Sequence, residues 1–88
     1  MKKPRRLPKK IRSIIAARAR RMGYTFKSMA EAINTKKGGS PVTLQSVYGW
    51  VKGRCCPCPA NAEALILALN IKDPVAEAIR FESSRIKA

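Results

Sequence analysis

The chain contains no histidine and only five acidic residues among its 88 positions. Histidine and carboxylate side chains carry most general acid–base catalysis, and no serine or cysteine here has a candidate base beside it. A glycine-rich phosphate-binding loop is also missing from the sequence. We therefore expect a protein that is not an enzyme and that uses neither a cofactor nor a small-molecule substrate.

Long apolar runs are also missing. The longest, at residues 64–69, has six residues, whereas a membrane-spanning helix needs about 20. The basic start, MKKPRRLPKK, is not followed by the apolar stretch of a secretory signal. We expect a cytoplasmic protein without a membrane partner.

Cysteine is limited to three residues in one short stretch, Cys55, Cys56 and Cys58. In a cytoplasmic protein they are expected to be thiols. A zinc site needs four ligands, so a metal here would require a carboxylate or a second subunit in addition to the three thiolates. We expect no metal, and thiols that pack or lie in a loop.

Negative charge is scarce and unevenly placed. Residues 55–88 hold four basic and four acidic residues, whereas residues 1–54 hold one acid, Glu31, and fifteen basic residues: Lys2, Lys3, Arg5, Arg6, Lys9, Lys10, Arg12, Arg18, Arg20, Arg21, Lys27, Lys36, Lys37, Lys52 and Arg54. A formal net charge of +14 points to a polyanionic partner, with nucleic acid first because each neutralised phosphate releases counterions. A solvated, ribosomal-type basic surface and an anionic membrane surface are the alternatives.

Apolar periodicity predicts an all-α domain of five helices. The first begins at Lys9 and ends before Gly23. The second follows Thr25 as its N-cap and ends at Asn34 in a left-handed conformation. The third follows Thr43, directs Val47, Trp50 and Val51 inward, and stops at Gly53.

The fourth helix is expected over residues 59–70, apolar on nearly every side. The fifth is expected after Asp73 as N-cap, with Pro74 in its first position. Residues 1–8 are predicted to be a mobile basic arm that buries nothing, residues 9–82 the folded domain, and residues 83–88 a frayed tail.

Three segments in order resemble the phage repressor and Cro type of helix-turn-helix protein, often called the XRE-like family. They are TFKSMAEAIN (25–34), TLQSVYGWVKG (43–53) and CPANAEALILALNI (58–71). The resemblance implies a lambda-repressor-like fold that inserts residues 43–52 into the major groove of double-stranded DNA. It also implies a transcriptional regulator, a Cro-like repressor of phage or prophage genes that acts by occupying an operator in the nucleoid of a bacterial cell.

The chain departs from the family pattern between the two motif helices. Residues 35–42, TKKGGSPV, stand where the family has about one residue. The crossing angle of the two helices is therefore expected to come from core packing alone. Phe26 and Leu44 also replace residues that are usually polar.

The expected DNA contacts follow from the position of each residue on these elements. We assign contacts with base edges to the exposed side of the helix expected in the major groove, at Leu44, Gln45, Ser46 and Tyr48. We assign contacts with backbone phosphates or with the minor groove to Arg5, Arg6, Lys27, Lys36, Lys37, Thr43, Lys52 and Arg54. Trp50 is expected in the core.

The near-neutral C-terminal helix, with Val75, Ala78, Ile79, Phe81 and Ile86, is the candidate homodimer surface, and intramolecular core is the alternative for it. Two other functions stay open. One is an antitoxin-type interaction protein with the same fold. The other is an architectural or RNA-binding protein that does not read sequence.

Overall fold

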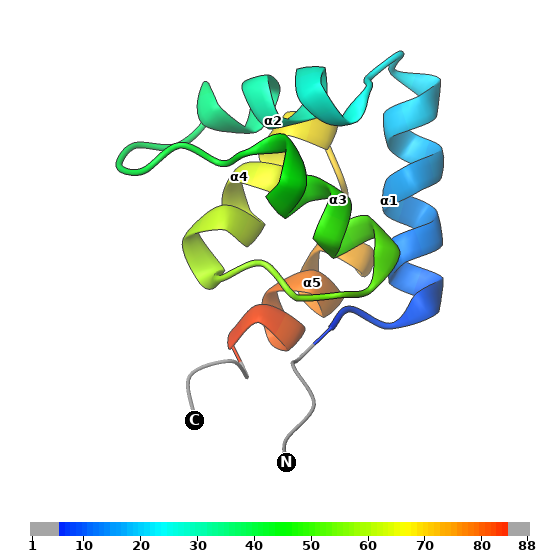
Figure 1. Cartoon of the computed structure of the whole chain (residues 1–88). Helices are drawn as coiled ribbons and strands as arrows, with labels where there is room; N and C mark the ends of the chain where they lie inside the picture. Colours follow the sequence, from blue (N-terminus) through cyan, green and yellow to red (C-terminus); the bar gives the residue numbers. More distant parts are fainter. Residues whose placement is uncertain (1–5, 85–88) are drawn as a thin grey trace.

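The computed structural model describes residues 6–84, and all the regular structure in that part of the chain is helical (Figure 1). The prediction of an all-α domain with five helices is therefore confirmed. The helices are α1 (Lys9–Arg21), α2 (Phe26–Asn34), α3 (Leu44–Lys52), α4 (Pro59–Leu69) and α5 (Val75–Ser84). None of them is long and apolar enough to cross a membrane.

Local side-chain and backbone signals set most helix ends as predicted. The hydroxyl of Thr25 accepts a hydrogen bond from the Ser28 N–H, and the Ser28 hydroxyl accepts one from the Thr25 N–H, which forms a capping box. Gly23, Gly53 and Asn70 have φ of 79°, 82° and 52°, and the left-handed region ends helices in this way. The sequence thus determines the bounds of α1, α3 and α4 locally.

The predicted frayed tail at residues 83–88 is wrong for Ser83 and Ser84, because both lie in α5 and Ser83 is buried. Residues 85–88, with Ile86, lie outside the described residues.

Two further predicted helix ends are wrong. The left-handed end at Asn34 is absent, because Asn34 is helical and Thr35 after it keeps a right-handed φ of −71°. The start of α5 lies at Val75 rather than after Asp73. The carbonyl of Pro74 accepts a hydrogen bond from the Ala78 N–H, so Pro74 precedes the helix rather than opening it.

The long connection between α2 and α3 is anchored where it rejoins the body. The Asn34 side chain accepts a hydrogen bond from the Val42 N–H at 2.6 Å and donates one to the Val42 carbonyl at 3.0 Å. Val42 itself is buried. The expectation that core packing alone relates the two helices is therefore wrong: the loop extends from the body (Figure 1), but this pair of hydrogen bonds closes it at its base.

The core lies between α4 and the remaining helices. Leu65 and Leu69 of α4 are almost completely buried, as are Val47 and Trp50 of α3. The core position expected for Trp50 is confirmed. α4 is buried on most of its surface as predicted, with Leu67 as the large apolar exception at 59% exposure.

The segment before α1 is part of this core. The prediction that residues 1–8 bury nothing is wrong for Leu7, whose side chain is fully buried. The Leu7 carbonyl also accepts a hydrogen bond from the Nε of Arg12 at 3.0 Å. Among the described residues of the predicted arm, Arg6 and Pro8 are exposed.

α5 packs against α4 and contributes Ala76 and Ile79 to the core. Ile79 is fully buried, so its assignment to a dimer surface is wrong and the intramolecular alternative holds for it. Arg80 pairs with Glu63 of α4 and lies 3.7 Å from Asp73. The hydrogen bond with Glu63 raises the pKa of Arg80 above its usual value.

Candidate nucleic-acid interface

α3 presents one polar, acid-free side to solvent. Leu44, Tyr48 and Lys52 are four residues apart and therefore share a face, with Gln45 beside them. Leu44, Gln45 and Lys52 are exposed and Tyr48 is half-buried. Because Val47 and Trp50 point into the core, this face is available to a partner.

The first turn of α3 is fixed by its own hydroxyl groups. The Thr43 hydroxyl accepts a hydrogen bond from the Ser46 N–H at 3.2 Å, and the Ser46 hydroxyl lies 3.2 Å from that of Thr43. The predicted N-cap is confirmed. Ser46 is therefore held against the cap, whereas Gln45 beside it extends freely, which makes Gln45 the better candidate for reading a base.

Tyr48 organises the cations at the end of α3. The Lys52 Nζ and the Arg54 Cζ lie 5.8 Å and 5.6 Å from the centroid of its ring, within cation–π distance. Phe26 packs edge-on to the same ring, with centroids 5.3 Å apart. The structure thus brings together three predicted contact residues, Tyr48, Lys52 and Arg54, and uses Phe26 to support them.

The segment after α3 folds back onto the helix at Gly49. The Gly49 carbonyl accepts a hydrogen bond from the Arg54 N–H at 2.8 Å. A Cβ at Gly49 would lie 3.0 Å from the Cys55 Sγ. Glycine at this position therefore lets Arg54 and the cysteine-containing segment approach the helix closely, which positions Arg54 near Tyr48.

A basic hollow of about 290 Å³ lies between α1 and the C-terminal turn of α3. It is lined by Lys9, Arg12, Ser13, Ala16, Val51 and Lys52, without an acidic side chain. Arg12 is held in place by its bond to the Leu7 carbonyl and by contact with Gly53, where a Cβ would lie 2.6 Å from Nη1. The hollow therefore offers one fixed and two exposed cations to an anion.

Lys9, Arg12 and Ser13 were not among the predicted contact residues. Their side of α1 can be read from helical spacing, but only the folded chain places it beside Lys52. The signal available in the sequence was the spacing of Lys9 and Arg12, one turn apart on the polar side of the helix.

Four of the five remaining predicted backbone contacts fall within the described residues. Lys27 and Lys36 are exposed, and Lys37 donates a hydrogen bond to the Ser40 carbonyl within the loop. Arg6 is exposed, and Arg5 lies outside the described residues. None of the four described residues contacts the Tyr48 cluster, so all five assignments stay predictions.

Cys55 and Cys56 are half-buried and Cys58 is exposed, and none of the three forms a disulfide. Among the described residues, no group of three or more cysteine, aspartate or glutamate side chains is placed to hold a metal ion.

Comparison of the chain with protein-family models, with curated proteins and with solved structures gave no match in any of the three.

Proposed function

We propose that this protein is a sequence-specific regulator of transcription that binds double-stranded DNA with α3 in the major groove. The observation that carries the proposal is the acid-free exposed face of α3, bordered at its end by Lys52 and Arg54 around Tyr48. An α-helix fits the major groove, and base edges there carry a distinct pattern for each base pair. The resemblance to phage repressors and Cro proteins supports the same placement.

Base reading is assigned chiefly to Gln45, because a glutamine side chain can bond adenine N6 and N7 together. Leu44, which is 44% exposed, would contact a thymine methyl group. Tyr48 would contact a base or the backbone through its hydroxyl, while its ring holds Lys52 and Arg54. Ser46 would add a contact only by rotating away from Thr43.

Phosphate contacts are assigned to two groups of cations. Lys52 and Arg54 follow the recognition helix directly. The basic hollow, with Lys9, Arg12 and Ser13, would hold a backbone phosphate next to them, because a fixed arginine is preorganised for phosphate. These contacts set register and affinity without reading sequence.

A homodimer would match a palindromic operator with half-sites about one helical turn apart. Two large apolar side chains on α4 and α5 face solvent: Leu67 is 59% exposed and Phe81 is 60% exposed. The Glu63–Arg80 pair joins the two helices next to them. We propose this surface, in place of one centred on Ile79, as the dimer contact.

The test is DNA binding at several salt concentrations, with the region upstream of the protein's own gene compared with random duplex of equal length. We expect a preference of roughly 10³ or more for the specific site. Gln45→Ala should reduce specific binding by about tenfold or more, which corresponds to about 1–3 kcal/mol for a lost bidentate base contact. It should leave binding to random duplex unchanged.

Equal, steeply salt-dependent binding to both duplexes or to RNA would contradict sequence-specific regulation and favour an architectural protein. A lack of binding to any nucleic acid at low salt would contradict the proposal outright and leave an interaction protein of the antitoxin type.

A further inference from the structure

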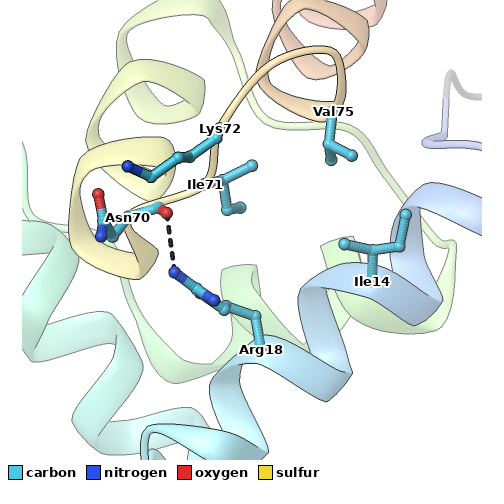
Figure 2. A pocket seen from close by; sticks show the side chains of 6 residues that line it. All are labelled: Ile14, Arg18, Asn70, Ile71, Lys72 and Val75. Atoms are coloured by element: carbon cyan, nitrogen blue, oxygen red, sulfur yellow. Dashed lines mark hydrogen bonds between the residues drawn. The ribbon is translucent and has the colours of Figure 1, made fainter.

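A second hollow, of about 240 Å³, lies between α1 and the connection from α4 to α5 (Figure 2). It is lined by Ile14, Arg18, Asn70, Ile71, Lys72 and Val75. Ligand sites are typically concave and apolar, with a few convergent polar groups that fix orientation. This hollow has both features and takes no part in the proposed DNA contacts.

One end of the hollow is cationic. Arg18 donates from Nε to the Leu69 carbonyl at 2.9 Å and from Nη2 to the Asn70 carbonyl at 3.0 Å, so its guanidinium is fixed at the C-terminus of α4. Both partners are neutral carbonyls, and a guanidinium has five N–H donors. These two bonds use two of the five donors, so three N–H donors remain for an anion, with Lys72 on the same side of the hollow (Figure 2).

The other end is aliphatic. Ile14 of α1 and Val75 of α5 lie across the hollow from the cations, and Ile71 lies between the two ends (Figure 2). All three side chains are half-buried, so each still presents apolar surface to solvent. Removing that surface from water would stabilise a bound apolar group.

We propose that this hollow binds a small aliphatic monocarboxylate, with the carboxylate at Arg18 and Lys72 and the tail against Ile14, Ile71 and Val75. The distribution of charge and apolar surface selects this class, because a neutral alcohol would leave the cations unpaired and a short acid would leave the aliphatic wall in water. The volume is below that of sites for drug-sized ligands, which start at about 300 Å³. It therefore suits a short chain.

The test is a titration of the full ¹⁵N-labelled chain with hexanoate, with acetate and hexanol as probes that each keep one half of the ligand. We expect saturable amide shifts at residues 14, 18, 71, 72 and 75 with hexanoate, and much weaker binding of the other two probes. No DNA is present, so the result is independent of the proposed function.

Variants locate the site. Val75→Phe should weaken hexanoate binding by more than about tenfold, because the ring fills the space that the tail occupies. Lys72→Gln should weaken it by about two- to fivefold, as for a partly exposed charge pair. Lys10→Gln removes an exposed lysine of α1 that does not line the hollow, and it should leave the affinity unchanged. The spectrum of each variant also reports whether it is folded.

The proposal is overturned if hexanoate produces no saturable shift in the millimolar range. It is equally overturned if hexanol or acetate binds as tightly, or if Val75→Phe keeps the affinity of the parent. A loss with Lys10→Gln equal to that with Lys72→Gln would show that net charge rather than this hollow attracts the acid.

Discussion

Residues 6–54 and residues 55–84 share the core almost evenly but differ at the surface. Of the eighteen buried hydrophobic side chains among residues 6–84, ten lie between Leu7 and Trp50 and eight between Ala62 and Ile79. The surface of the first part carries nearly all the unbalanced positive charge. In the second part, Arg80 pairs with Glu63 and lies near Asp73.

This difference separates two tasks within one small fold. α4 and α5 provide packing, and their exposed side chains Leu67 and Phe81 are suited to protein contact. α1, α2 and α3 also pack, but their solvent side carries cations in fixed positions: Lys52 and Arg54 lie over the Tyr48 ring, and Arg12 is bonded to the Leu7 carbonyl. Changes in the second part should therefore alter stability or assembly, and changes on the solvent side of the first should alter binding to polyanions.

The largest expected effect comes from the core of the C-terminal part. Leu65→Ala should lower the free energy of unfolding by about 2–5 kcal/mol, because it removes a buried side chain and leaves a cavity. Urea denaturation measures the loss. The control is Leu67→Ala, the same change on the same helix at a side chain that is 59% exposed. At a protein concentration low enough to keep the chain monomeric, it should be near neutral. Equal losses would contradict the described packing of α4.

The next effect concerns the base of the long loop. Asn34→Ala should cost about 2 kcal/mol of unfolding free energy, because it removes two hydrogen bonds and leaves buried backbone groups of Val42 without a partner. Asn34→Asp keeps the acceptor for the Val42 N–H and should cost less. An alanine variant as stable as the parent in thermal unfolding would show that core packing alone relates α2 and α3.

An effect of similar size is expected at the end of α3. Gly53→Ala should cost more than the roughly 1–2 kcal/mol of a left-handed alanine, because its Cβ would also displace Arg12. Gly23→Ala is the control, since its φ is 79° but nothing lies within 4 Å of the new Cβ. The difference between the losses of unfolding free energy in Gly53→Ala and in Gly23→Ala measures what displacing Arg12 costs. If Gly53→Ala loses no more stability than Gly23→Ala, Arg12 is not held against Gly53.

The smallest effect contrasts two lysines. Lys52→Gln should reduce the slope of log affinity against log salt by about one and weaken specific and random duplex binding alike, because one phosphate contact is lost. Lys72→Gln removes the same charge from the connection between α4 and α5 and should leave the slope unchanged. Equal changes in the two variants would indicate a diffuse attraction by net charge.

Most of the fold follows from local signals that can be read in one sequence. Apolar spacing predicted the five helices, and Thr25, Thr43, Gly53 and Asn70 determined ends that the structure confirms. Two of the errors arose where a residue outside the predicted element decides the outcome. Asn34 bonds to Val42 eight residues away, and Leu7 enters a core that is built mainly by later helices.

The candidate site was predictable along α3 but not across elements. Helical spacing placed Leu44, Gln45 and Tyr48 on one side, away from Trp50. It did not reveal that Phe26 would support Tyr48 or that α1 would bring Arg12 beside Lys52. Such contacts depend on how helices cross, which a single sequence does not encode in any local pattern.

The most direct test of the account is to map the DNA-binding surface by titrating a short duplex of the upstream region into ¹⁵N-labelled protein. We predict that the amide shifts concentrate on residues 44–54, the start of α2 and the side of α1 that lines the basic hollow, and that α4 and α5 stay unaffected apart from dimer contacts. Shifts centred on the exposed face of α4 and α5, with α3 unchanged, would contradict the assignment of DNA binding to α3.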